Sequence, residues 1–359
     1  MARVLPLGKL PIDLLQRLLA YTSTGPELIV SAAAGEDAAV AAGAPVIVLT
    51  ADPITFTEER IGAYVVAVNA NDIVAMGGRP VYLTTTMLAP PGTTDERLEA
   101  VFADIAEACR TAGMLWAGGH TEVTPAVNRI VVAGQAVGFL ARAPLATSGA
   151  RPGDLIAMSK WAALEGTTLI ARERPGESEA VLGGDRHRAV LAWLERPGIS
   201  IVAEGRALEG LELTSGHDPT EGGIAMGVHE IARRSGCGAL LAGDRIPVRE
   251  ETRLLCARFG LDPLGLLGSG VFMFTAARAV AEEACRRLDR AGIPAALIGE
   301  MLGTGDPVLI ERGGRRESLP FSVQDEIVKV QGSRAEDGLS DRGRMGKGTT
   351  ARPRPCTGS

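Results

Sequence analysis

Four short polar stretches in the first half of the chain carry side chains that could do chemistry. They read GEDAAV from residue 35, ADP from residue 51, NAND from residue 69 and GGHTE from residue 118. They supply carboxylates at Glu36, Asp37, Asp52, Asp72 and Glu122. Mg²⁺ prefers such oxygens and takes its remaining ligands from water and substrate phosphates, while adjacent glycines let backbone N–H groups approach a polyphosphate. An Asp in a turn is more often a cap or a turn former, so the order of the four stretches carries the argument.

Alternating predicted strands and helices position these stretches. A helix is predicted within residues 1–25, opened by Pro11, and others at 59–76 and 93–113. Strands are predicted at 45–52, 81–88 and 129–140 from their apolar, β-branched runs. The small residues and Pro-Gly of 146–154 mark a boundary.

The second half repeats this alternation. Strands are predicted at 154–160, 270–276 and 295–301, and helices near 163–174, 187–208, 221–235 and 281–291. The fold class is therefore α/β (α+β) with two domains, over residues 1–148 and 149–312. Residues 331–359 lack apolar periodicity and predict a disordered tail.

Composition excludes several classes of function. The chain of 359 residues has a net charge of -6 and 46% hydrophobic residues, which argues against a nucleic-acid partner or an anionic membrane surface. No stretch approaches the roughly 20 apolar residues that span a bilayer. The cysteines lie scattered without CxxC spacing, which is typical of reduced thiols and predicts a cytoplasmic protein: Cys109, Cys237, Cys256, Cys285 and Cys356.

The ordered motifs resemble a known signature. GEDAAV, TADPITF, NANDIVAMGG, GGHTEVT and GHDPTEGGIAMGVHEIA are similar to the motifs of the aminoimidazole-ribonucleotide (AIR) synthetase, or PurM-like, superfamily. This group includes thiamine-monophosphate kinase, selenophosphate synthetase and the hydrogenase-maturation protein HypE. The match covers roughly residues 8–310, and the chain looks most like HypE and HypE-like proteins.

The resemblance implies a site as well as a fold. It implies an N-terminal sheet that forms a barrel with that of a second subunit, with ATP near this interface and Mg²⁺ held by acidic residues. Carried over by position, the metal ligands would be Asp37, Asp52 and Asp72. The nucleotide-binding residues would be Gly35, Asn71, Gly118, Gly119, Asp218, Gly222 and Gly223. The last of these precede the helix expected at 221–235, whose N-terminus suits phosphate, although a plain N-cap by Thr220 is the alternative.

Three further residues are candidates for catalysis. His120 stands where many relatives have Asp; an imidazole is a poor Mg²⁺ ligand, so Glu122 supplies the carboxylate or one metal position is lost. His120 could instead act as an acid or base, and a structural or substrate-contacting role is equally open. Lys160 follows a predicted strand, where it would contact phosphate or simply lie exposed.

HypE proteins end in a Pro-Arg-X-Cys tail whose terminal thiol carries the carbamoyl group. Here residues 353–356 read PRPC, but three more residues follow, so Cys356 is either an acceptor thiol or a chance match.

The sequence predicts a Mg-ATP-dependent enzyme that activates an amide-type oxygen by phosphoryl transfer. One alternative is a small-molecule kinase of the thiamine-monophosphate kinase type. Another, from a different class, is a low-turnover ATP-binding partner of a maturation protein. The expected ligands are ATP, Mg²⁺ and a carboxamide or other small molecule, and a homodimer is expected.

Overall fold

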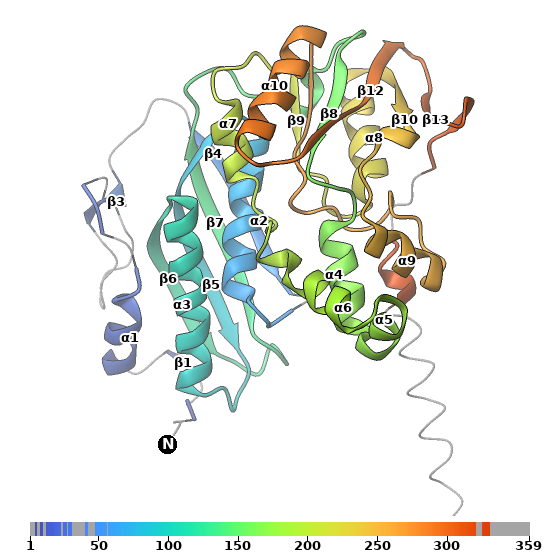
Figure 1. Ribbon diagram of the computed structural model, residues 1–359. Helices are drawn as coiled ribbons and strands as arrows, with labels where there is room; N and C mark the ends of the chain where they lie inside the picture. The colour runs from blue at the N-terminus through green and yellow to red at the C-terminus, as the bar shows by residue number, and fades with distance from the viewer. Residues whose placement is uncertain are drawn as a thin grey trace, which may run out of the picture.

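The computed structural model describes residues 4–5, 8–9, 12–22, 24–26, 28–30, 40–41, 47–55, 57–320 and 325–330 (Figure 1). Gly35, Asp37, Cys356 and the tail predicted at 331–359 lie outside the described residues. Two mixed sheets with helices packed on them make an α/β architecture, as the sequence predicted.

The first sheet has the strand order β1-β6-β5-β7-β4. Its strands are β1 (Gly8–Lys9), β4 (Ile47–Ile54), β5 (Arg79–Ala89), β6 (Leu115–Val123) and β7 (Val131–Phe139). β5 and β6 run parallel, and β7 pairs antiparallel with both β4 and β5. The short strands β2 (Leu28–Val30) and β3 (Val40–Ala41) form a separate pair beside helix α1 (Ile12–Leu19).

Helices α2 (Ile61–Ala75) and α3 (Asp95–Ala112) cover one face of this sheet (Figure 1). The Thr94 side chain accepts a hydrogen bond from the Arg97 N–H at the start of α3, and Gly113 ends the helix at a φ of 73°. Twelve of the fifteen residues of α2 are buried, so this helix is covered on all sides. Gly134 of β7 lets it lie close, since a Cβ there would come within 2.4 Å of the Asn69 side chain.

The second sheet has the order β14-β13-β10-β12-β8-β11-β9. Its strands are β8 (Leu155–Ser159), β9 (Ser215–His217), β10 (Cys237–Ala242), β11 (Met273–Ala276), β12 (Ala295–Thr304), β13 (Val308–Arg312) and β14 (Arg315–Ser318). Around it lie α4 (Leu164–Glu173), α5 (Pro175–Leu182), α6 (Gly184–Leu191), α7 (Val202–Leu208), α8 (Gly223–Ser235), α9 (Glu250–Phe259) and α10 (Arg278–Arg290).

The single helix predicted at 187–208 is wrong. α6 ends at Leu191, a 3₁₀ turn follows at Ala192–Leu194, and α7 begins only at Val202. Pro197 lies in the break, where its missing N–H and its ring oppose helical pairing. The turns that result bring Ile199 and Ile201 against Asn71 of α2.

One apolar core joins the two sheets. It contains Ile73 and Val74 of α2 together with Ile201, Val202 and Phe272 of the second half. α2 is therefore the element through which the first sheet meets the second domain.

Candidate functional site

β4 and α2 bring Asp52 and Asp72 together. Along β4 the exposure alternates, and Thr50 and Asp52 face α2. The Thr50 hydroxyl donates to Asp72 Oδ2 at 2.5 Å. Burial, followed by a hydrogen bond with Asp52, raises the pKa of Asp72 to about 7. The Asp72 carboxyl group thus lies within hydrogen-bonding reach of the Asp52 side chain, and a cation could bind between the two.

Asn69 fixes the backbone of Asp52. Its Oδ1 accepts from the Asp52 N–H at 3.1 Å, and its Nδ2 donates to the Asp52 carbonyl at 3.2 Å and to the Val65 carbonyl at 2.8 Å. Sequence reasoning did not place Asn69 in the site. The available signal was an amide directly after the apolar run of residues 61–68, since a fully buried amide requires partners.

Asn71 joins α2 to the segment before α7. Its Nδ2 donates to the Ile199 carbonyl at 2.8 Å, and its Oδ1 accepts from the Ile201 N–H at 2.9 Å. The side chain is fully buried. Asn71 was expected to contact a nucleotide, but these two bonds occupy its Oδ1 and one of its two N–H donors, which favours a role in holding the two domains together.

Asp218 lies at the end of β9, across the domain boundary from α2. It is buried, and neither carboxyl oxygen has a hydrogen-bond partner of suitable geometry among the described residues. Burial and then the charge of Asp72 raise its pKa well above the usual range, while Asn71 and Lys160 oppose the rise. An orphaned buried carboxyl group is costly unless something pairs with it, so Asp218 points to a ligand.

The N-terminus of α8 differs from the expectation. The Gly222 N–H, expected to face a phosphate, donates to Asp325 Oδ2 at 2.8 Å. The alternative expectation, an N-cap by Thr220, is not met either. The N-cap residue of α8 is Gly222, which has no side chain that could cap the helix. At Gly223 a Cβ would come within 2.4 Å of the Leu266 carbonyl, which makes this glycine a packing requirement.

Lys160 is buried, not exposed at a strand end. Its Nζ lies 2.6 Å from Glu204 Oε1 and donates to the Ser200 and Gly270 carbonyls, each at 2.8 Å. The three Nζ donors of Lys160 are thus matched by three acceptors within the second domain. The positive charge of Lys160 lowers the pKa of Asp218, against the larger rise that burial causes.

His120 and Glu122 lie on the other face of the first sheet. In register, Asp52 aligns with Gly134 and Thr85, whereas His120 aligns with Thr86, one residue on. Successive strand residues point to opposite faces, so both side chains point away from α2. They are exposed, with His120 Nε2 3.4 Å from Glu122 Oε2.

Gly118 and Gly119 belong to an irregularity in β6. The β5–β6 register shifts between Leu83 and Thr85, and at Gly119, with a φ of 155°, a Cβ would come within 1.8 Å of the Thr85 carbonyl. These two glycines allow close strand contact at that point.

The structure thus assembles Asp52, Asp72 and Asp218 around α2, with Asn71 between them, and separates His120 and Glu122 from this group. Within the described ranges no three His, Cys, Asp or Glu side chains come close enough to hold a metal by themselves. Cys109, Cys237, Cys256 and Cys285 are free thiols. None of the helices described is long and apolar enough to cross a membrane.

Two family models match the chain. The AIR synthase related protein N-terminal domain matches residues 35–140, and the corresponding C-terminal domain matches residues 151–311. The chain belongs to the AIR synthase-related family, and the predicted PurM-like, two-domain architecture is confirmed.

Among its relatives the chain is similar to HypE proteins. Carbamoyl dehydratase HypE of Azotobacter vinelandii is 31% identical over 258 residues, covering 70% of this chain and 72% of that protein. A putative hydrogenase expression/formation protein of Methanocaldococcus jannaschii is 27% identical over 304 residues, covering 82% and 88%. The resemblance to HypE deduced from the motifs is thus confirmed.

Solved structures that include HypE are similar to this chain as well. HypE in complex with ATP matches with a TM-score of 0.70 and 25% identity, over 88% of this chain and 94% of that one. HypE from a HypE–HypF complex matches with a TM-score of 0.65 and 25% identity, over 77% and 90%. Thiamine-monophosphate kinase of Stenotrophomonas maltophilia matches with a TM-score of 0.70 over 85% and 97%, but at 21% identity this likeness shows the fold alone.

Proposed function

We propose that the chain is a Mg-ATP-dependent enzyme that activates an amide-type oxygen by phosphoryl transfer, in the manner of HypE. The observation that carries the proposal is the carboxyl group of Asp218, buried with no hydrogen-bond partner of suitable geometry among the described residues and close enough to Asp72 for the charge of Asp72 to raise its pKa. The similarity to carbamoyl dehydratases supports the reaction class, and the likeness to a HypE–ATP complex supports the nucleotide.

The residues present fit Mg²⁺. Asp52 and Asp72 would hold the ion as one or two carboxylates, with phosphate oxygens and water completing the shell, and Asp37 is a further candidate. A divalent cation would favour the ionised form of Asp72, whose pKa is raised mainly by burial and less by the neighbouring Asp52. When bound, Mg-ATP supplies the phosphoryl group and the charge neutralisation that its transfer needs.

The reaction needs a proton acceptor as well. The amide oxygen attacks the terminal phosphorus of ATP and ADP leaves; loss of phosphate then forms the nitrile, and the amide nitrogen gives up both of its protons. The Asp218 carboxyl group is buried near Asp72, with no hydrogen-bond partner of suitable geometry among the described residues, so we assign its ionised form to accept one of these protons. Asn69 holds β4 against α2, and Asn71 holds the segment before α7 against α2, through their backbone contacts.

We also propose a homodimer formed through the outer face of the first sheet. Ile47 and Leu49 of β4 are 52% and 67% exposed on this face, and β7 alternates between buried and half-buried residues. A second copy would cover these apolar side chains and would bring His120 and Glu122 into the interface. A maturation protein is a further partner, as the HypE–HypF complex suggests. We place the protein in the cytoplasm, where thiols stay reduced.

The test is a calorimetric titration with ATP plus Mg²⁺ on the intact protein, on Asp72→Asn and on the control Asp185→Asn. Asp185 lies on α6 with a 99% exposed side chain. We expect saturable binding that Asp72→Asn weakens at least tenfold and Asp185→Asn leaves unchanged. Absence of binding by the intact protein would overturn the proposal.

A measurement of ADP release then distinguishes the proposed enzyme from the kinase and from the low-turnover partner protein. Release that depends on a carboxamide supports the proposed reaction. Release with thiamine monophosphate would replace it by the kinase alternative, and firm binding without turnover on either would favour a low-turnover partner protein.

A further inference from the structure

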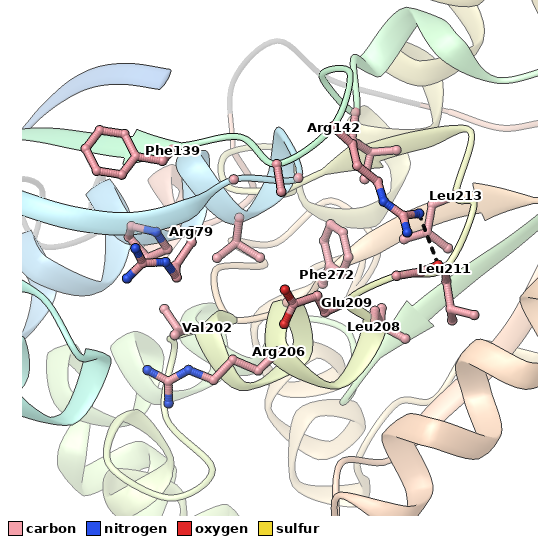
Figure 2. A pocket seen from close by; sticks show the side chains of 18 of the residues that line it. Arg79, Phe139, Arg142, Val202, Arg206, Leu208, Glu209, Leu211, Leu213 and Phe272 are labelled. Carbon is pink, nitrogen blue, oxygen red and sulfur yellow. Dashed lines mark hydrogen bonds between the residues drawn. The ribbon is translucent and has the colours of Figure 1, made fainter. Parts of the chain in front are cut away.

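A large cavity lies between the domains at the C-terminal end of α2. Its volume is about 710 Å³, within the range of small-molecule sites. Its walls come from the end of α2, the start of β5, the segment after β7 and the residues of α7 and beyond, as Figure 2 shows.

This cavity is separate from the carboxylate site. Asp72 faces β4 and bonds Thr50, whereas Val74 lines the cavity and packs toward Gly205 of α7. Two residues along a helix are about 200° apart around its axis. The cavity therefore opens on the face of α2 opposite to the proposed nucleotide site.

Three arginines from different elements line the cavity (Figure 2). Arg206 Nη2 donates to the Ala112 carbonyl at the end of α3 (2.6 Å), and Arg142 Nη1 donates to the Gly210 carbonyl (3.1 Å). Each uses one of five N–H donors in this way. Arg79 makes no ion pair or side-chain hydrogen bond with any residue that the structure describes, so its whole guanidinium group is available.

The remaining lining combines apolar surface with two acids. Phe272 and Leu208 are among the apolar residues that line the cavity (Figure 2). Glu209 and Glu212 offset two of the three positive charges. A ligand that matches this lining carries one anionic group for the arginines and an apolar body.

We propose that this interdomain cavity binds a small organic anion, either a phosphate monoester or a carboxylic acid, with an aromatic or aliphatic body. Arg79 binds the anionic group, because its guanidinium donors match the oxygens of phosphate and carboxylate in pairs. The apolar walls cover the body of the ligand. Such a ligand contacts both domains at once, since Arg79 belongs to the first sheet and Arg206 to α7.

The experiment is a calorimetric titration of the full chain with phenyl phosphate, inorganic phosphate and benzyl alcohol, without Mg²⁺. Phenyl phosphate should bind saturably and at least tenfold more tightly than either of the other probes, because each of them lacks one half of the recognised chemistry. Arg79→Gln should weaken the binding of phenyl phosphate about tenfold, the typical effect of losing a charge-assisted hydrogen bond.

Two controls keep the result specific. Arg253→Gln, at an exposed position on α9 away from the cavity, should leave phenyl phosphate binding unchanged. Asp72→Asn should also leave it unchanged, which separates this site from the proposed nucleotide site. The inference is overturned if phenyl phosphate does not bind, if it binds no better than inorganic phosphate, or if Asp72→Asn abolishes binding while Arg79→Gln does not.

Discussion

Replacing Glu165 by Gln should stabilise the protein at alkaline pH. Glu165 lies in the first turn of α4 and is only 2% exposed. Burial, with smaller contributions from Asp325 and Glu221, raises the pKa of its carboxyl group to about 7, although a hydrogen bond with Ser269 opposes the rise.

The sign and the size follow from linkage between proton binding and folding. Below pH 4.5 the folded and the unfolded chain both hold the Glu165 proton. Between pH 4.5 and 7 only the folded chain holds it, so the free energy of unfolding falls as pH rises. The pKa difference of 7 against 4.5 corresponds to a loss of about 3 kcal/mol by pH 8. Gln has the same shape and carries no charge, so it removes this loss.

The assay is urea unfolding of Glu165→Gln and of the unaltered protein at pH 5 and pH 8 in metal-free buffer. We expect a gain of about 3 kcal/mol at pH 8 and little change at pH 5. Glu179→Gln, at an exposed position on α5, is the control and should change neither. A gain of the same size at both pH values, or none at pH 8, would refute the reasoning, since neither follows from a buried charge.

The other predictions concern stability and rest on single contacts. Asn71→Ala leaves the Ile199 carbonyl and the Ile201 N–H without their partner and should lower the free energy of unfolding by about 2–4 kcal/mol, measured by denaturant against the exposed control Asn128→Ala; an equal effect of the two would contradict the domain-joining role. Lys160→Met leaves Glu204 buried without a counter-charge and should cost about 3–5 kcal/mol. Adding Glu204→Gln to Lys160→Met should restore part of the lost stability, measured by thermal unfolding. A double variant no more stable than Lys160→Met would argue against the ion pair. Gly119→Ala should destabilise by about 3 kcal/mol or more, because a Cβ meets the Thr85 carbonyl at 1.8 Å; amide exchange on β5 and β6 should rise, and unchanged exchange would show that the strands accommodate it.

Local physical chemistry explains which elements the sequence predicted well. α3 was expected over 93–113 and spans Asp95–Ala112, because its apolar spacing and its terminal glycine act within a few residues. The helix expected over 59–76 is α2, at Ile61–Ala75. The helix expected over 187–208 is broken around Pro197, a local signal that the prediction missed, whereas the contact of the following residues with Asn71 of the first domain is one that no local pattern encodes.

The order of the polar motifs was enough to predict the family, the two-domain fold and the acidic residues of the candidate site. Only the tertiary structure decided which of them meet. Strand register places Asp52 on the α2 face and His120 on the opposite one, and a shift of one residue would exchange those faces. Similarly, only packing shows that Lys160 is paired with Glu204 and that Asp218 is buried without a partner among the described residues. Residue types and spacing determine what chemistry is available, whereas burial and pairing depend on contacts between segments distant in the chain.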